Sequence, residues 1–203
     1  MPRILPSARP NRNSSKVNRV QANQLRIIGG QWRSRRLPIA DVVGLRPTPD
    51  RVRETLFNWL QPVIAGARCL DLFAGSGALG FEALSREAAE VIFVEQDSRA
   101  FKQLQANAAS LGANQAVLVH ADAFSYLQRE TLGFDVVFLD PPFRKALPEQ
   151  ILTALFTQRL LKPTTVIYLE HELDYQLDFS QWNLTVHRQT KAGQVMSFLL
   201  KSV

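Results

Sequence analysis

The sequence predicts an α/β fold with a mostly parallel sheet, and two features of the chain indicate it. From Ala67 onward, short apolar runs alternate with segments whose apolar residues recur at helical spacing. Strands and helices in strict alternation are typical of parallel strands joined by right-handed crossovers. The last two apolar runs differ, because only residues 190–193 separate them, which predicts an antiparallel hairpin. We therefore expect five β/α units closed by a β-hairpin.

The elements of this fold follow from the same patterns in chain order. The final hairpin pairs the runs WNLTVHRQ, residues 182–189, and QVMSFLLK, residues 194–201. The expected strands before it are Cys69–Phe73, Glu90–Glu95, Ala116–His120, Phe134–Leu139 and Thr165–His171, and the expected helices are about Ala78–Arg86, Ser98–Leu111, Ala123–Arg129 and Pro148–Leu155.

A smaller unit precedes this sheet. Residues 1–22 are rich in Arg, Asn, Ser and Pro without hydrophobic periodicity, so we expect a basic flexible tail. The run QLRIIGGQWRSRRLPI, residues 24–39, predicts a β-hairpin with a tight turn at Gly29-Gly30. Thr48 as N-cap, followed by Pro49, predicts a helix to about Leu60. Its apolar face would be Val52, Leu56, Phe57 and Leu60. We divide the chain into the tail, an extension at 23–62 and a main domain at 63–203.

Composition limits the class of protein. The chain has 203 residues, 46% hydrophobic and 21% charged, as in a soluble globular protein. It has no apolar run of roughly 18 to 20 residues and no signal peptide, so we expect a cytoplasmic protein that does not bind membranes. The single Cys69 excludes an internal disulfide. His120, His171 and His187 lack ligand spacing, so we expect no metal.

Positive charge is concentrated at the N-terminus. Residues 1–53 contain twelve Lys and Arg against two Asp, a balance of +10, whereas residues 54–203 contain twelve against sixteen acids, a balance of −4. Such asymmetry favours a polyanionic partner, most often nucleic acid, although a solvated basic tail remains an alternative for residues 1–20. Within the hairpin, the candidate contacts are Arg26, Arg33, Arg35 and Arg36, with Trp32 among them.

A glycine motif follows the first strand of the main domain. Gly75, Gly77 and Gly80 form a G-x-G-x-x-G pattern, which predicts close backbone approach to a ligand at a helix N-terminus. The motif alone is weak, and a merely tight turn is the alternative. It is not a phosphate-binding P-loop, because Phe81 stands where that motif has Lys.

Three acids end successive strands around this motif. Asp71 precedes the glycines, where a carboxylate would repel a pyrophosphate but attract an ammonium group. Glu95 can accept two ribose hydroxyls, and Asp122 lies where an adenine amine can donate. S-adenosylmethionine carries all three groups. The residues expected to bind it are Asp71, Phe73, Ala74, Gly75, Ser76, Gly77, Glu95, Gln96, Asp122 and Ala123.

The fourth strand ends in Asp140-Pro141-Pro142-Phe143. Neither proline has a backbone N–H, so the chain leaves the sheet in a stiff form whose carbonyls stay free to accept hydrogen bonds. The end of a parallel strand is also where open α/β sheets bind ligands. A simple strand stop before a helix is the alternative.

These segments together resemble a known family. LDLFAGSGALGFEALSR, Glu95, HADAF and DPPF resemble the motifs of class I S-adenosylmethionine-dependent methyltransferases, which have a Rossmann-like seven-stranded sheet with a C-terminal antiparallel hairpin. With LRIIGGQWRSRRL and LRPTPDRVRETLFNWL, residues 25–200 resemble the RsmD-type guanine-N2 methyltransferases of the bacterial small ribosomal subunit. Pro49 departs from the Thr that is commoner in that family.

The resemblance implies an activity, a partner and roles for residues. The protein would methylate the exocyclic N2 amine of a guanine in 16S rRNA, free or in an assembling 30S subunit, and we expect a monomer. Asp140 and the Pro141 carbonyl would accept the amine hydrogens, Pro142 would stiffen the segment and Phe143 would stack on the base. Arg51 would contact RNA together with the hairpin arginines. Three roles stay open for Arg53: contact with the cofactor carboxylate, contact with RNA, or a place on a solvated helix face.

Other functions remain open at this stage. The DPPF motif also occurs in enzymes that methylate adenine N6 or DNA. A dinucleotide-dependent oxidoreductase would use the same glycine motif but has no use for Asp71. A nonenzymatic RNA-binding protein that kept the fold is a third alternative.

Overall fold

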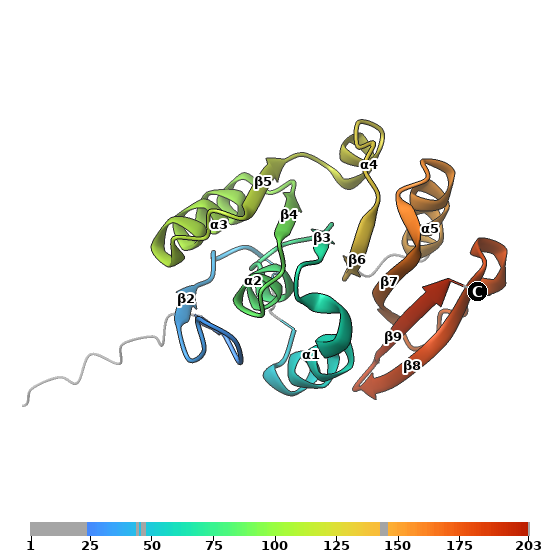
Figure 1. The fold of residues 1–203 in the computed structure, drawn as a ribbon, viewed down its shortest axis with the longest axis horizontal. Helices are drawn as coiled ribbons and strands as arrows, with labels where there is room; N and C mark the ends of the chain where they lie inside the picture. Colours follow the sequence, from blue (N-terminus) through green and yellow to red (C-terminus); the bar gives the residue numbers. More distant parts are fainter. Residues whose placement is uncertain (1–23, 44, 46–47, 143–145, 203) are drawn as a thin grey trace, which may run out of the picture.

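The computed structural model describes residues 24–43, 45, 48–142 and 146–202. They form a seven-stranded sheet with helices on both faces and a two-stranded hairpin beside it (Figure 1). Within these ranges no helix is long and apolar enough to cross a membrane. The predicted tail at 1–22 and Phe143 lie outside the described residues.

The seven-stranded sheet confirms the predicted topology. Its strand order is β5-β4-β3-β6-β7-β9-β8; the first five strands are parallel, and β9 is antiparallel to β7 and β8. The chain therefore runs outward from β3 in one direction and then from β6 in the other. The strands are β3 (Arg68–Asp71), β4 (Glu90–Glu95), β5 (Ala116–His120), β6 (Phe134–Leu139), β7 (Leu161–Glu172), β8 (Leu184–Ala192) and β9 (Val195–Ser202).

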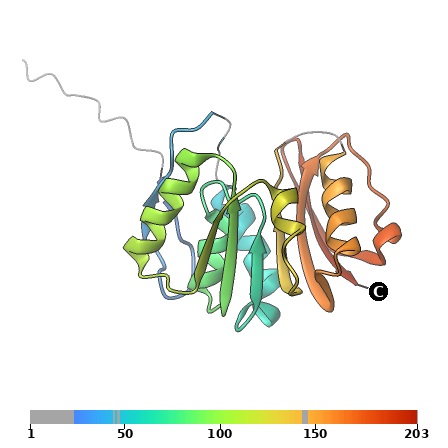
Figure 2. The same cartoon turned by 90° about the horizontal axis from the view of Figure 1, so that it is seen from above.

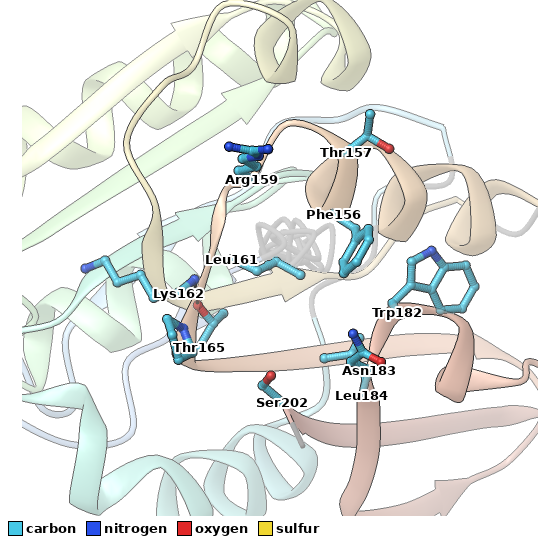
Figure 3. Close-up of a pocket in the computed structure, with 11 residues that line it drawn as sticks. Phe156, Thr157, Arg159, Leu161, Lys162, Thr165, Trp182, Asn183, Leu184 and Ser202 are labelled. Atoms are coloured by element: carbon cyan, nitrogen blue, oxygen red, sulfur yellow. Dashed lines mark hydrogen bonds between the residues drawn. The ribbon is translucent and has the colours of Figure 1, made fainter.

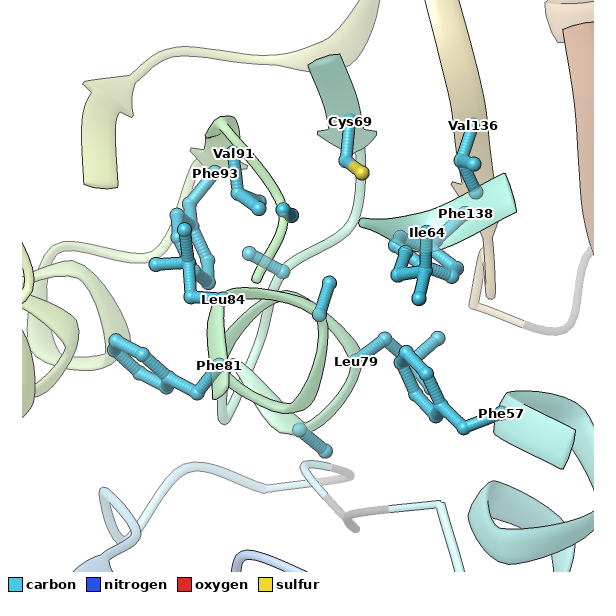
Figure 4. Close-up of a cluster of buried hydrophobic side chains, with 14 of the residues drawn as sticks. Phe57, Ile64, Cys69, Leu79, Phe81, Leu84, Val91, Phe93, Val136 and Phe138 are labelled. Atoms are coloured by element: carbon cyan, nitrogen blue, oxygen red, sulfur yellow. The ribbon is translucent and has the colours of Figure 1, made fainter. Parts of the chain in front are cut away.

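Helices cover both faces of the sheet because strand residues alternate between two apolar clusters (Figure 2). In the first cluster, Phe81 of α2 packs on Phe93 of β4 with ring centroids 4.8 Å apart, and Phe57 of α1 packs on Phe138 at 5.9 Å (Figure 4). The helices are α1 (Asp50–Ile64), α2 (Ala78–Ser85), α3 (Ser98–Leu111), α4 (Ala123–Leu127), α5 (Leu147–Thr157) and the 3-10 helix η1 (Phe179–Trp182), which the sequence did not predict.

The N-terminal hairpin is present, but its predicted tight turn is wrong. Strand β1 (Gln24–Arg26) pairs antiparallel with β2 (Arg36–Pro38), and residues 27–35 connect them. The connection is long because it docks on the end of α2. The backbone N–H of Gln31 donates to the Ser85 carbonyl at 2.8 Å, and that of Trp32 donates to Ser85 Oγ at 2.9 Å. Contacts with α2 therefore set this turn.

Helix α1 begins one residue later and ends four residues later than predicted. Its N-cap is Pro49, so Thr48 is not the cap, and it continues past Pro62 to Ile64. It thus crosses the expected boundary between residues 62 and 63. The hairpin, α1 and the sheet also share one apolar cluster.

Arg53 is a structural residue, which answers the question that the sequence left open. Its side chain is only 1% exposed. The guanidinium donates to the Thr48 carbonyl at 3.1 Å and the Arg26 carbonyl at 2.8 Å, and it pairs with Asp50 at 2.6 Å. Its Nη1 lies 3.6 Å from Glu82 of α2. Arg53 therefore joins the hairpin, α1 and α2.

Candidate active site

The site is defined by the reversal of strand order between β3 and β6. Open α/β sheets bind ligands at such a switch point, beyond the carboxyl ends of the strands. Asp71 is the last residue of β3, and Asp140 directly follows β6. The parallel strands all end along one side of the sheet, which we call the site edge. We call the opposite side, where these strands begin, the far edge.

The glycine motif forms the turn from β3 into α2 at the site edge. Gly75 and Gly77 have positive φ angles of 51° and 76°, which side chains rarely adopt. A Cβ atom on Gly75 would also lie 2.7 Å from the Leu45 side chain, which covers the turn from the segment before α1. Both glycines are therefore required by the backbone, and the segment before α1 adjoins the motif.

Asp71 lies beneath this turn rather than open to the crevice. It is 4% exposed, and its carboxylate accepts the N–H of Gly80 at 2.9 Å in the first turn of α2. Burial raises the pKa of Asp71 to about 7, with contributions from the charges of Asp140 and Glu95, while the Gly80 hydrogen bond opposes the rise. Asp71 therefore supports the glycine turn directly.

Glu95 holds the other side of the turn. Its two carboxylate oxygens accept the N–H groups of Gly75 at 2.8 Å and Asp97 at 2.6 Å. Each oxygen keeps a lone pair that can accept a further hydrogen bond. Gln96 is exposed beside it. A diol can therefore approach this carboxylate without breaking the turn.

Asp122 stands apart from these buried acids. It is the exposed N-cap of α4, where its carboxylate accepts the Ser125 N–H at 3.0 Å. Hydrogen bonds from Ser125 lower the pKa of Asp122, so it remains ionised. It follows β5 at the site edge, one strand beyond Glu95. An exposed carboxylate there can accept a hydrogen bond from an amine.

Asp140 is half-buried and meets a residue that the sequence assigned elsewhere. Thr48 Oγ1 donates to Asp140 Oδ2 across 3.4 Å. Burial raises the pKa of Asp140 to about 6, and the Thr48 hydroxyl opposes that rise. Pro141 is buried and Pro142 is exposed. The segment before α1 and the end of β6 are thus joined at the candidate reaction centre.

Sequence reasoning missed a further acid of this site, Glu170. It is 7% exposed near the end of β7, and the Tyr168 hydroxyl donates to it. Burial and the charge of Asp140 raise the pKa of Glu170 to about 8. Its signal was available in the run VIYLEHE, where an acid lies near the end of a buried strand, as Asp71 and Glu95 lie at the ends of theirs.

A cavity at the other end of the sheet lies away from these acids. Its volume is about 750 Å³, and its lining residues include Phe156, Arg159, Lys162 and Trp182 (Figure 3). They come from the end of α5, the start of β7 and η1, so the cavity belongs to the far edge. Lys162 there is paired with Asp135 at 2.7 Å. No residue that the sequence predicted for the site lines this cavity.

The predicted RNA-binding arginines fall into two sets. Arg26 pairs with Asp50 at 2.8 Å in the first turn of α1, and Arg51 is exposed in the same turn. The second set is on or next to the hairpin connection, which contacts the last turn of α2, and Arg35 donates to the Ser110 carbonyl at 3.0 Å in the last turn of α3. Those helices end at the far edge. Arg36 faces Arg26 across the hairpin, so it belongs with Arg26 and Arg51 in a site-edge set, and Arg33 and Arg35 form a far-edge pair.

No group of three or more His, Cys, Asp or Glu side chains that could hold a metal ion is found in the described part of the chain.

Comparisons with known proteins agree on one family. Residues 25–201 match the family model described as "Conserved hypothetical protein 95". The chain is 49% identical over 180 residues to the "Ribosomal RNA small subunit methyltransferase D" of Escherichia coli K12, covering 89% of this chain and 91% of the relative. The Haemophilus influenzae protein of the same name is 46% identical over 172 residues, covering 82% and 89%. The solved structure of Escherichia coli yhhF matches with a TM-score of 0.80 and 47% identity, covering 89% of this chain and 99% of that one.

Proposed function

Because the chain belongs to the family of the ribosomal RNA small subunit methyltransferase D proteins, we propose that it methylates the exocyclic N2 amine of a guanine in 16S rRNA, with S-adenosylmethionine as the methyl donor. The observation that carries the proposal is the position of Asp140-Pro141. This pair follows β6 at the switch point, beside the acid and glycine turn that end β3. The names of the relatives support ribosomal RNA as substrate and give no support to an oxidoreductase.

The residues around the glycine turn suit this donor. Glu95 can accept the ribose hydroxyls through lone pairs that its backbone partners leave free. Asp122 is exposed and ionised, so its carboxylate can accept a hydrogen bond from the adenine amine. Asp71 is buried next to the turn, where its charge favours a cationic group. The backbone of Phe73, Ala74 and Ser76, with Gln96 and Ala123, completes the proposed binding surface.

Asp140 and Pro141 are proposed to orient the amine. The Asp140 carboxylate and the Pro141 carbonyl accept its two N–H groups, which turns the nitrogen lone pair toward the methyl group. When bound, the donor supplies a methyl carbon on a sulfonium that leaves as a neutral thioether. Asp140 then takes the proton that the amine loses. Alignment contributes most of the acceleration, and proton acceptance adds about 10² to 10⁴.

RNA contact is proposed for both sets of arginines. A base inside a helix is out of reach of Asp140, so the target guanine must be unpaired or flipped out. The site-edge set, Arg26, Arg36 and Arg51, would contact phosphates next to that base. The far-edge pair, Arg33 and Arg35, would contact a separate part of the same RNA, which favours a large folded substrate such as a 30S particle. We propose that the protein acts as a cytoplasmic monomer.

The test is a methylation assay on undermethylated substrate. Small subunits and 16S rRNA from cells that lack the gene are incubated with the protein and labelled S-adenosylmethionine, and the modified nucleoside is identified by mass spectrometry. We expect N2-methylguanosine in the 16S rRNA. N6-methyladenosine would identify the adenine alternative, and no transfer to either substrate would contradict the proposal.

A further inference from the structure

Asp140 and Glu170 are neighbours across the β6–β7 pair. The last paired residues of these parallel strands are Leu139 and Leu169, and each acid directly follows its leucine. Phe138 and Tyr168, two residues earlier, lie in the same apolar cluster. Because side chains alternate along a strand, Asp140 and Glu170 project on that same face, toward α1 and α2.

The described residues around the two carboxylates are polar, and none of them forms an ion pair with either acid. The Tyr168 hydroxyl donates to Glu170, Thr48 donates to Asp140, and Ser197, the β9 neighbour of Glu170, is 1% exposed. The next titratable group is Asp71 on β3, another acid, whose pKa the charge of Asp140 raises. Among the described residues, no Lys, Arg or His forms an ion pair with Asp140 or Glu170.

Two adjacent carboxylates in such a place cannot both ionise without a large cost. Burial penalises each charge, and the like charge next to it penalises the second one further. One proton therefore stays in the pair near neutral pH. Thr48 and Tyr168 each donate a hydrogen bond that favours the ionised form of its acid, but Glu170 is the more deeply buried of the two, so burial places the proton on Glu170 and the charge on Asp140. The pKa of Asp140 is raised to about 6 and that of Glu170 to about 8, so these values also place the shared proton on Glu170.

We propose, on the basis of the methyl transfer proposed above, that Glu170 is a positioning residue that holds a proton beside Asp140 and leaves Asp140 as the single anion presented to the target amine. The Tyr168 hydroxyl donates to one carboxyl oxygen of Glu170 and fixes its orientation. After nitrogen attacks the methyl carbon and the carbon–sulfur bond breaks, Asp140 receives the amine proton and passes it to water. Glu170 keeps its own proton throughout, so the buried pair never carries two charges.

The substitution that isolates this role is Glu170→Gln, because an amide has nearly the shape of a neutral carboxylic acid and cannot ionise. Glu172→Gln is the matched control, two residues further along β7 and outside the buried row. Carboxyl carbons of protein labelled with ¹³C-glutamate are followed by NMR over a pH range. We expect one glutamate to titrate near pH 8, to be absent in Glu170→Gln and to remain in Glu172→Gln.

Activity then tests whether the neutral form is the working one. If the neutral form is the working one, methyl transfer by the wild-type protein falls as Glu170 ionises above about pH 8, whereas Glu170→Gln, which cannot ionise, shows no such fall. A loss of about tenfold or more in a stably folded Glu170→Gln protein would mean that the ionised glutamate is needed and would overturn the proposal. So would a wild-type titration in which every glutamate ionises below pH 6. If the wild-type protein transfers no methyl group to small subunits, the proposed function fails and the positioning role with it, whereas the titration still reports where the proton lies.

Discussion

Thr48 Oγ1 donates a hydrogen bond to Asp140 Oδ2 across 3.4 Å, and this contact joins the segment before α1 to the end of β6. It gives the N-terminal extension a direct part in the candidate site, because Thr48 is itself held by Arg53, which links the hairpin, α1 and α2. The extension therefore does more than carry positive charge.

Replacing Thr48 by Val removes this hydrogen bond with little change in shape. The hydroxyl stabilises the ionised carboxylate, so its loss raises the pKa of Asp140 above about 6. Activity requires ionised Asp140, so on acidification the variant loses activity at a higher pH than the wild-type protein does. We expect a loss of about threefold at pH 6 and little change at pH 8, from a hydrogen bond of about 1 kcal/mol. Thr55→Val is the control, since Thr55 donates only within α1. A profile that does not shift would contradict the role of Thr48.

The buried acids also predict how stability depends on pH. The folded-state pKa values of Asp71, Asp140 and Glu170 are raised, so the folded protein holds protons that the unfolded chain releases near pH 4. Their contribution to the free energy of unfolding is therefore present below that pH and is lost as the pH rises to about 8. Glu170→Gln should raise this free energy by roughly 2 kcal/mol at pH 8 and by little at pH 4.5, measured by urea denaturation. Equal effects at both pH values would refute the assignment.

Arg51 and Arg53 are close in the sequence, but the structure predicts that replacing them changes the free energy of unfolding by very different amounts. Arg53→Ala leaves the Thr48 and Arg26 carbonyls without their donor and removes a cation from buried Glu82. We expect a loss of about 3 kcal/mol in the free energy of unfolding. Arg51 is exposed, so Arg51→Ala should change it by less than about 0.5 kcal/mol. Thermal or urea denaturation decides, and similar values for the two variants would contradict the structure.

The positions of the two sets of arginines predict that the effect of a substitution on RNA affinity depends on the size of the RNA. Arg51→Ala should weaken binding both to a short RNA around the target base and to the small subunit. Arg33→Ala should weaken binding only to the subunit, because Arg33 belongs to the far-edge pair. Each substitution should reduce the salt slope of log K by about 0.7 to 0.9 where its phosphate contact is lost. Arg159→Ala, in the far-edge cavity, is the control. Equal effects of Arg33→Ala on both RNAs would place Arg33 and Arg35 near the base.

The sequence predicted the sheet well because its signals are local. Strands β4, β5 and β6 have the predicted bounds, since each is an apolar run with sharp ends. The hairpin turn was predicted wrongly because the carbonyl and hydroxyl of Ser85, 53 or more residues away, accept the hydrogen bonds that shape it. A turn set by such distant partners has no local pattern.

The candidate site could be predicted only where its residues occur in local sequence motifs. Asp140 and the glycine turn occur in short motifs, so they were found. Thr48 was assigned as a helix cap, a local role, whereas its hydroxyl meets Asp140, 92 residues further on. Glu170 was missed because its meaning depends on the neighbouring strand. Strand order, which sequence alone leaves open, makes it a partner of Asp140.

The most direct test of the central claim is Asp140→Ala, assayed for methyl transfer to undermethylated small subunits and, by calorimetry, for binding of S-adenosylmethionine. Asp135→Ala, near the other end of the same strand, is the control. We predict that Asp140→Ala lowers transfer by at least about 10² while the dissociation constant of the donor changes by less than about threefold. Unchanged turnover would remove Asp140 from the reaction and contradict the account.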